Sequence, residues 1–222
     1  MIGIDIGNTL TKIYELTSNP PKLIKTIATG ETIPYLSDKS IIIASVNKHA
    51  LNKWKKLYPT ARVLTHNENW SFSIDPGLNL STVGIDRLLA INGLSTNTAL
   101  VVMLGTATVI NVVIENTFMG GSISPGIEAM YKGLTEKAPG LKLFKPKKGH
   151  IIGKTSQEAI YSGIYYMQAL WIDRFNSVVG NLPIIYTGGS YHLLKDILPK
   201  GTYIPHLVAI GMQKLHLLEQ QL

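Results

Sequence analysis

Cysteine is absent from this 222-residue sequence, which excludes disulfides, thiolate metal sites and a cysteine nucleophile. The six histidines show no HxxxH or related ligand spacing, so we interpret them as surface or core-edge residues. Charged residues are few, at 16% of the chain, and mean hydropathy is slightly positive at +0.16. A disordered chain is therefore excluded, and the 45% hydrophobic content can build one large domain or two small ones.

Long hydrophobic runs are also absent. The most apolar stretch, TALVVMLGTATVINVVI from Thr98 to Ile114, contains Gly105 and Asn111 and is too short and too polar to span a bilayer. No charged region precedes an apolar segment at the N-terminus, so the sequence shows no secretion signal. We expect a cytoplasmic protein with no membrane partner.

Basic residues give the chain a formal net charge of +7, which attracts anions in general without selecting one partner. The clearest lysine cluster, LKLFKPKKGH at 141–150, lacks the aromatic interleaving of a single-strand binder. We interpret this cluster as a solvated loop and expect no nucleic-acid partner.

The N-terminal sequence IGIDIGNTLTKIYEL predicts a hairpin with polar residues at its tip. Alternating isoleucines indicate a strand over 2–6, and a second strand is expected over 10–16. An ordinary turn is one interpretation, because Gly and Asn accept positive φ. The other is a phosphate loop: backbone amides, the Asn-Thr pair that begins at Asn8 and the Lys12 ammonium bind phosphate, which Asp5 faces through Mg²⁺.

Further elements follow this hairpin. They are a strand over 40–46, a helix over Lys48–Tyr58, a short strand near 62–64, a loop over His66–Ser81 and a helix that begins near Gly84 and ends before Ser95. An N-terminal run of strands that is followed by a helix and a further strand indicates an α/β domain with a mixed sheet.

From Thr98 the pattern of strand, glycine turn and strand begins again. Residues 5–9 (DIGNT) can be laid over residues 103–107 (MLGTA). The repeat predicts two similar α/β lobes, 1–97 and 98–222, and the last helix could pack back on the first lobe. Two glycine turns that face one cleft could bind a polyphosphate from both sides.

The second lobe is expected to contain two helices and a further glycine turn. Ser124 and Pro125 favour a helix start, and Pro139-Gly140 favours a stop. TSQE at Thr155–Glu158 matches a capping box and opens a long helix to about Val179. Its aromatic residues at helical spacing indicate core, with part of the stripe as a candidate subunit interface. Next, NLPIIYTGGSYHLL predicts a strand that runs into a Gly-Gly turn.

Four motifs stand in order along the chain: DIGNTLTK, GIDR, LGTAT with GGSISPG, and YTGG. This series resembles the type III pantothenate kinases from Asp5 to about Gly189. The resemblance implies a duplicated ribonuclease H-like (actin-like ATPase) α/β fold with two lobes, mixed sheets and a cleft between them. It also implies a homodimer that uses ATP to phosphorylate pantothenate, the first step of coenzyme A biosynthesis.

The resemblance further implies roles for individual residues. Asp86 is the implied catalytic base, and its place in the first turn of a helix favours the ionised form. Arg87 suits a carboxylate such as that of pantothenate, because its guanidinium can bind two oxygens. Asp5 is implied to lie near Mg²⁺. The implied substrate-binding residues are Gly84, Ile85, Asp86, Arg87 and Ser156. The implied ATP-binding residues are Asp5, Ile6, Gly7, Asn8, Thr9, Leu10, Thr11, Lys12, Gly105, Thr106, Thr187, Gly188 and Gly189.

The sequence departs from the family at several positions, among them Val109, which replaces a threonine, and Ser156, which stands where the family usually has a threonine. Similar kinases usually read DxGTATTxD in the second loop, where the first Asp helps to hold a monovalent cation; Met103 and Asn111 stand at the two acidic positions here. A thioether is a poor ligand for K⁺, so we expect the usual K⁺ or NH₄⁺ site to be missing or rebuilt. Gly77 replaces a tyrosine that commonly contacts pantothenate.

Three functions remain open at this point. The first is an active pantothenate kinase that tolerates these departures. The second is a non-catalytic, nucleotide-binding regulatory homologue, which the residues Met103, Asn111 and Gly77 motivate. The third is a kinase for another small alcohol, because Gly77 could open the substrate pocket.

Overall fold

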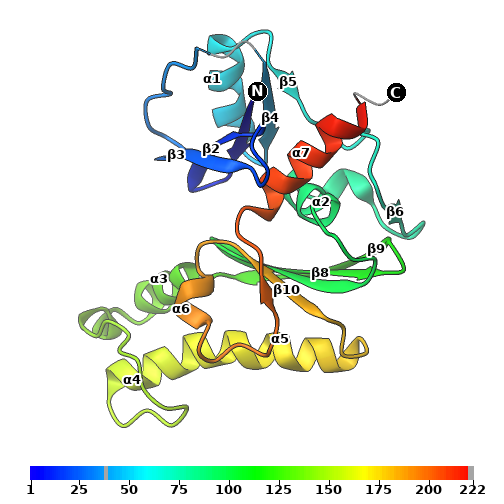
Figure 1. Cartoon of the computed structure of the whole chain (residues 1–222). Helices are drawn as coiled ribbons and strands as arrows, with labels where there is room; N and C mark the ends of the chain where they lie inside the picture. The colour runs from blue at the N-terminus through cyan, green and yellow to red at the C-terminus, as the bar shows by residue number, and fades with distance from the viewer. Residues whose placement is uncertain (38–39, 220–222) are drawn as a thin grey trace. The chain divides into compact units, whose positions relative to one another are not determined.

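The computed structural model describes residues 1–37 and 40–219. Their contacts divide the chain into two compact units. The first unit comprises residues 1–97, 113–120 and the described part of 206–222, and the second comprises 98–112 and 121–205. Figure 1 shows the chain with most of its helices and strands labelled.

The first unit contains a five-stranded mixed sheet in the order β3-β2-β1-β4-β5. Its strands are β1 (Ile2–Ile6), β2 (Leu10–Glu15), β3 (Lys22–Ala28), β4 (Ile41–Ser45) and β5 (Arg62–Val63). β1 pairs antiparallel with β2 and parallel with β4. The isoleucines of β1 alternate along the strand and therefore lie on one face of the sheet, where Ile4 and Ile6 are fully buried in the core. The predicted N-terminal hairpin is confirmed.

Helix α1 (Lys48–Leu57) packs on this core through Ala50 and Trp54, which are both buried. It begins at Asn47, whose side chain accepts a hydrogen bond from the Ala50 N–H at 3.0 Å, as is usual for an N-cap. Lysines in its last turn, Lys55 and Lys56, complement the helix dipole. The predicted helix is thus confirmed, with an apolar stripe inside and a basic face outside.

Helices α2 (Ile85–Asn92) and α7 (Leu207–Glu219) pack against each other in the first unit (Figure 1). A Cβ on Gly211 would lie 1.8 Å from the Leu89 carbonyl oxygen, so only glycine allows this approach. The buried Asn92 donates to the Gly211 carbonyl at 2.9 Å and accepts from the Ser71 N–H at 3.0 Å. One amide therefore ties the loop before α2 to the last helix. A short 3₁₀ segment, Leu80–Thr82, precedes α2.

The second sheet has six strands in the order β11-β10-β7-β8-β9-β6. They are β6 (Ser73–Ile74), β7 (Ala99–Leu104), β8 (Ala107–Ile114), β9 (Thr117–Pro125), β10 (Ile184–Thr187) and β11 (Thr202–Tyr203). Without β6, the order β9-β8-β7-β10-β11 repeats that of β3-β2-β1-β4-β5. The central strand again has a parallel neighbour, β10. The predicted duplicated α/β fold with mixed sheets is confirmed.

Helices of the second unit pack on this sheet's core. They are α3 (Ile127–Lys137), a 3₁₀ segment (Pro139–Leu143), α4 (Ser156–Tyr161), a π-helical segment (Ser162–Tyr166), α5 (Met167–Val178) and α6 (Tyr191–Leu194). Thr155 caps α4 by accepting from the Glu158 N–H at 3.2 Å, as predicted. The Glu158 carboxylate instead accepts from the Lys154 N–H at 2.8 Å, so only half of the predicted capping box forms.

The structure corrects the sequence interpretation in two places. Helix α3 begins at Ile127, after Gly126, because Ser124 and Pro125 still belong to β9. Strand β3, which lies between the hairpin and β4, was not among the predicted elements. It is an edge strand whose side chains are mostly exposed, so it lacks the continuous apolar pattern that marks a buried strand.

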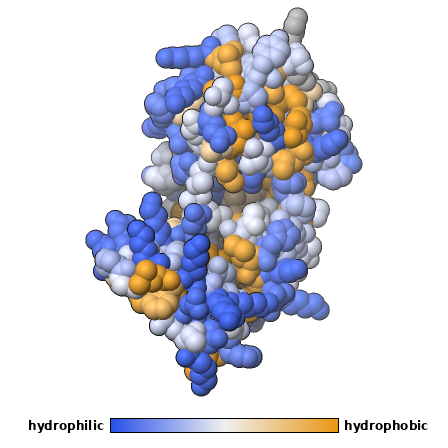
Figure 2. All heavy atoms as spheres, turned by 90° about the vertical axis from the view of Figure 1, so that its left-hand side faces the viewer, coloured by the Kyte–Doolittle hydropathy of each residue, from blue (hydrophilic) through white to orange (hydrophobic). Residues whose placement is uncertain are grey.

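The surface is mixed in character. Figure 2 shows mostly hydrophilic side chains over one face, with hydrophobic residues in separate patches. Within residues 1–37 and 40–219, no helix is long and apolar enough to cross a membrane.

Candidate functional site

The first glycine turn joins β1 to β2 through residues 7–9. The Gly7 N–H donates to the Leu10 carbonyl at 3.0 Å, and a Cβ on Gly7 would lie 2.9 Å from that same oxygen. Asn8 and Thr9 are exposed at the tip. The Asn8 and Thr9 side chains of the predicted phosphate loop are therefore presented to solvent beside a fixed Gly7 backbone.

Two of the predicted phosphate-binding residues lie beneath this tip. Ile6 and Thr11 are fully buried, and the Thr11 hydroxyl lies 3.2 Å from the hydroxyl of Thr29. Their side chains cannot reach a ligand in this structure. They support the turn from below, and Leu10 is exposed beside it.

Charges of both signs gather at the base of the turn, within the first unit. Asp5 and Lys12 are cross-strand partners on β1 and β2. Burial raises the pKa of Asp5 to about 6, the nearby Lys12 ammonium lowers it, and the Asp86 carboxylate raises it. Asp86 is therefore close enough to Asp5 to disfavour the charge of that carboxylate. A cation placed by Asp5 would relieve this repulsion.

Asp86 lies in the first turn of α2, as predicted, directly after Gly84 and Ile85. Its Oδ1 accepts a hydrogen bond from the Arg87 N–H at 2.9 Å. The expected effect of the helix dipole on the carboxylate is not the dominant one. Burial raises the pKa of Asp86 more than the hydrogen bond to Arg87 and the Arg87 charge lower it. Desolvation thus outweighs the favourable helix start.

Arg87 lies over an aromatic ring in the same unit. Its Cζ is 5.5 Å from the centroid of the Phe118 ring, and Phe118 is fully buried. A guanidinium in this geometry gains a cation–π interaction and loses rotational freedom. Partial burial lowers the pKa of Arg87, and the Asp86 carboxylate raises it.

Two supporting residues near these motifs were missed by the sequence interpretation. His66 makes a 2.7 Å hydrogen bond through Nε2 to the carbonyl of Val83, the residue before Gly84. His206 makes a 3.2 Å hydrogen bond through Nδ1 to the Tyr14 hydroxyl, and burial, followed by the Lys12 charge, lowers its pKa. No sequence signal could have found either, because both contacts join segments far apart in the chain.

The second glycine turn joins β7 to β8 through Gly105 and Thr106, both exposed. It is one residue shorter than the first turn. Gly126 packs directly on it: the Gly126 N–H donates to the Thr106 carbonyl at 3.0 Å, and a Cβ on Gly126 would lie 2.1 Å from the Gly105 carbonyl oxygen. Any residue with a side chain would therefore clash with the second turn at the last position of GGSISPG, which explains the glycine there.

Gln168 of α5 supports this arrangement from below. It is almost fully buried, and its Nε2 donates to the Pro125 carbonyl at 2.8 Å. Its Oε1 is buried without a hydrogen-bond partner among the described residues. The long helix is therefore connected to the second turn through the backbone of residues 125 and 126.

Met103 and Asn111 lie in contact at the two positions where the resemblance implies acidic residues. The Asn111 Nδ2 donates to the Met103 Sδ at 3.5 Å, and Asn111 is fully buried. A thioether that accepts from an amide supplies no hard, anionic oxygen. K⁺ prefers such oxygen ligands, so these two side chains do not fit the usual monovalent-cation site.

The third glycine turn follows β10. Gly188 has φ +98°, and a Cβ there would lie 2.2 Å from the Leu104 carbonyl oxygen, whereas Gly189 borders open space. Thr187 is buried. Tyr203 stacks on Tyr191 with ring centroids 4.0 Å apart, and its hydroxyl donates to the Gly188 carbonyl at 3.4 Å. The turn is thus held against the end of β7 by backbone contact and an aromatic pair.

Ser156 is the first residue of α4 and is exposed, beside the Thr155 cap. It belongs to the second unit, whereas Gly84, Ile85, Asp86 and Arg87 belong to the first. The structure therefore brings the GIDR residues together with Asp5 and Lys12 and leaves the placement of Ser156 as a prediction.

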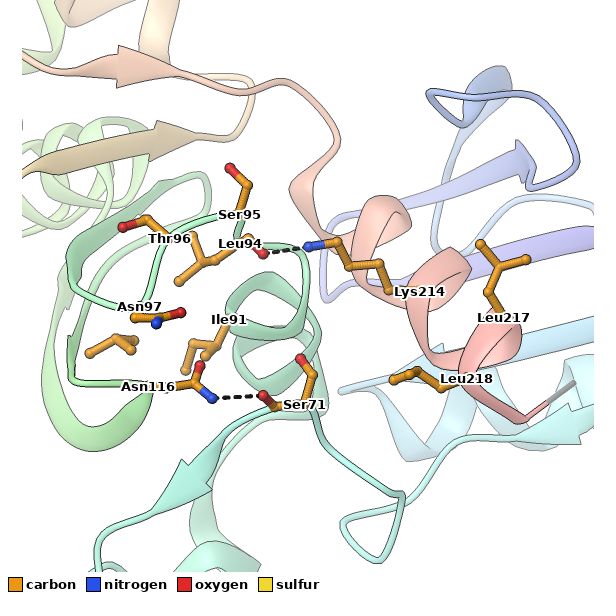
Figure 3. Close-up of a pocket in the computed structure, with 11 residues that line it drawn as sticks. Ser71, Ile91, Leu94, Ser95, Thr96, Asn97, Asn116, Lys214, Leu217 and Leu218 are labelled. Carbon is orange, nitrogen blue, oxygen red and sulfur yellow. Dashed lines mark hydrogen bonds between the residues drawn. The ribbon is translucent and has the colours of Figure 1, made fainter. Parts of the chain in front are cut away.

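A hollow of about 410 Å³ lies elsewhere in the first unit (Figure 3). Ile91, Leu94 and the turn that follows them line one side, and Leu217 and Leu218 of α7 line another. Lys214 crosses it and donates from Nζ to the Leu94 carbonyl. None of the predicted site residues lines this hollow.

Oxygen ligands for a hard cation are few. Among the described residues, no group of three or more His, Asp or Glu side chains could hold a metal ion. Mg²⁺ usually keeps several waters and binds one or two carboxylates together with substrate phosphates. The partly buried Asp5 carboxylate, next to an exposed phosphate-type turn, fits that mode.

Two sheets with the same strand order, each with a glycine turn after its central strand, define the actin-like ATPase fold. Solved structures agree on the fold. A Baf family protein from Campylobacter jejuni matches with a TM-score of 0.75 at 20% identity, covering 100% of both chains. Component A of the (R)-2-hydroxyglutaryl-CoA dehydratase of Acidaminococcus fermentans matches with a TM-score of 0.55 at 12% identity, covering 97% of this chain and 96% of that one.

Sequence comparison gives the family. The sequence model described as "Type III pantothenate kinase" matches residues 1–177. A type III pantothenate kinase of Pelagibacter ubique is 28% identical over 218 residues, which cover 86% of this chain and 88% of the relative. One of Mycoplasma mobile is 36% identical over 121 residues, which cover 52% of this chain and only 49% of that relative. The chain belongs to the type III pantothenate kinase family, as the sequence motifs predicted.

Proposed function

We propose that this protein transfers the γ-phosphoryl group of ATP to the hydroxyl of pantothenate, the first step of coenzyme A biosynthesis. The observation that carries the proposal is the family match over residues 1–177, together with a GIDR segment whose carboxylate lies near Asp5. Supporting it, the proposed base and phosphate turn occur in one compact unit. We propose that the reaction takes place in the cytoplasm.

Asp86 is the proposed general base. Its carboxylate accepts the proton of the substrate hydroxyl as the hydroxyl oxygen forms its bond to the γ-phosphorus and the bond from that phosphorus to the ADP oxygen breaks. Phosphoryl transfer depends mostly on positioning and charge stabilisation. Burial, which raises the pKa of Asp86, makes the carboxylate a stronger base than an exposed aspartate.

Arg87 is proposed to bind the pantothenate carboxylate. Its guanidinium is already oriented by the Phe118 ring at 5.5 Å, so less side-chain entropy is lost when it binds. Gly84, Ile85 and Ser156 are the other proposed substrate contacts. Gly77 lies in an Asx turn, where its N–H donates to Asp75 Oδ1 at 2.8 Å, and offers no side chain to a substrate.

The first turn is proposed to bind ATP phosphate through its amides, Asn8, Thr9 and Lys12. Bound by Asp5, Mg²⁺ would screen the repulsion between that carboxylate and the phosphates. Gly105, Thr106 and the backbone of Thr187–Gly189 are proposed as further ATP contacts. Each is held rigid by a close neighbour, Gly126 for the second turn and Leu104 for the third.

We propose that no monovalent cation binds between Met103 and Asn111. The amide–thioether pair described above offers neutral, partly soft ligands. The proposed kinase would therefore work without K⁺ or NH₄⁺.

We further propose a homodimer. On the long helix, Trp171 and Phe175 pack inward against the core of the second unit, whereas Met167 and Leu170 are about half exposed. Those exposed side chains could meet a second copy. Light scattering that gives one chain mass at micromolar concentration would contradict the dimer.

One experiment separates the candidate functions. Purified protein is incubated with Mg²⁺-ATP and, in turn, pantothenate or other small alcohols, and phosphorylated products are identified by mass spectrometry. Phosphopantothenate as the main product supports the proposal. A different phosphorylated alcohol would favour the kinase with an open pocket at Gly77, and nucleotide binding without any product would favour the regulatory homologue.

A further inference from the structure

Thr29, the residue after β3, lies under the first glycine turn. Its hydroxyl donates to the Gly7 carbonyl at 2.9 Å. Its backbone N–H donates to the Thr9 carbonyl, also at 2.9 Å. One residue thereby binds both flanks of the turn, from a segment twenty residues further along the chain.

The direction of the hydrogen bonds can be assigned. A hydroxyl has a single proton, and that of Thr29 is used on the Gly7 carbonyl. The 3.2 Å contact between the hydroxyls of Thr11 and Thr29 is therefore donated by Thr11. Thr11 is fully buried, so its hydroxyl proton is donated within the protein and not to a ligand. The result is a chain of two hydroxyls that ends on the carbonyl of the turn's glycine.

This arrangement leaves the outer side of the turn open. Asn8 and Thr9 are exposed, while the carbonyls of Gly7 and Thr9 are drawn inward by Thr29. Carbonyl oxygens that pointed outward would repel a phosphate. Because Thr29 binds these two carbonyls on the inner side, the exposed side chains of Asn8 and Thr9 are left to donate to an anion. The turn is also fixed in advance, so less conformational entropy is lost when an anion binds.

We propose that Thr29 is a positioning residue for the first turn, which it holds in the shape that binds the polyphosphate of a nucleoside triphosphate. The inference rests on the proposed function, because it takes ATP as the ligand. It adds a residue that lies outside the four motifs and does not touch the phosphates.

The test compares Thr29→Val, which keeps the branched shape and loses the hydroxyl, with Thr29→Ser, which keeps the hydroxyl. Thr32→Val is the matched control, because Thr32 is exposed three residues further on. We expect Thr29→Val to raise the KM for ATP roughly three- to tenfold, the range for one lost hydrogen bond. The KM for pantothenate should not change, and Thr29→Ser and Thr32→Val should resemble the wild type.

A second readout needs no catalysis. Amide hydrogen exchange of a peptide that covers residues 7–10 should be faster in ligand-free Thr29→Val than in the wild type, and Thr29→Ser should restore it. Unchanged exchange and an unchanged KM for ATP in a folded Thr29→Val protein would overturn the inference alone. A wild-type chain that neither binds nor hydrolyses ATP would overturn the proposed function, and the positioning role toward a nucleotide with it.

Discussion

A Cβ atom on Gly84 would lie 2.4 Å from Oδ1 of Asp86 and 3.4 Å from Cγ1 of Val46. The same Oδ1 accepts the Arg87 N–H. The carboxylate therefore occupies the space that a side chain at position 84 would need. A side chain at the glycine of GIDR would have to displace this carboxylate, because the aspartate folds back against the start of its own helix.

Gly84→Ala should displace the Asp86 carboxylate and lower kcat by about tenfold or more, since a misplaced base loses much of its effect. The backbone of Gly84, with φ −61° and ψ 137°, is open to alanine, so the fold should persist. Gly133→Ala is the matched control, because nothing lies within 4 Å of a Cβ there. Steady-state kinetics measure both variants, and wild-type kcat in Gly84→Ala would contradict the steric argument.

Asp86→Asn should lower turnover by roughly two to four orders of magnitude, the usual effect of a general base. Binding of Mg²⁺-ATP should survive, because the variant keeps the shape of the side chain and removes a nearby negative charge. Calorimetry measures binding, and a coupled assay measures turnover. The exposed Asp173 of α5 provides the control substitution, Asp173→Asn. Equal turnover in Asp86→Asn would remove Asp86 from the mechanism.

The pH dependence of stability follows from Asp5, whose pKa rises from 3.8 to about 6 on folding because of burial. Between these values the folded chain binds more protons than the unfolded chain, so this group makes the free energy of unfolding fall as pH rises. We expect Asp5→Asn to stabilise the ligand-free protein at pH 8 and to change it little near pH 4.

Thermal unfolding of both proteins in the absence of Mg²⁺ and nucleotide measures this difference. A destabilising effect of Asp5→Asn at pH 8 would show that the attraction between the Lys12 ammonium and the Asp5 carboxylate outweighs the cost of desolvating that carboxylate. The same variant should bind Mg²⁺-ATP more weakly than the wild type, because it lacks the proposed metal ligand.

Activity should be the same in buffers with K⁺, NH₄⁺ or only bulky organic cations, because Met103 and Asn111 supply no suitable ligand pair. Met103→Asp should introduce a dependence on K⁺, since it places a carboxylate beside the Asn111 amide. Strong activation of the wild type by K⁺ or NH₄⁺ would show that other oxygens form a cation site.

Much of the fold could be predicted because its signals are local. Alternating isoleucines in β1 and the Thr155 cap of α4 each lie within a few residues of the element that they define. Strand β3 escaped prediction because an edge strand buries little, and no alternating pattern marks it. The π-helical turn at Ser162–Tyr166 has no local sequence signal of its own.

Part of the candidate site could be proposed from the sequence for the same reason. Asp5 and Asp86 belong to short motifs, whereas Thr29 and His66 contact those motifs from distant segments. The pKa of Asp86 shifts upward, opposite to the direction that its helix position favours, because burial depends on tertiary packing and helix position does not report it. Residues that contact a motif from a distant segment of the chain therefore cannot be identified from the motif itself.

The most direct test of the central claim is the release of ADP by purified protein with Mg²⁺-ATP, measured with and without pantothenate in buffer free of K⁺ and NH₄⁺. The proposed function predicts turnover that depends on pantothenate and is lost in Asp86→Asn. Protein that is shown to be folded and releases no ADP, with or without added K⁺ and NH₄⁺, would contradict it.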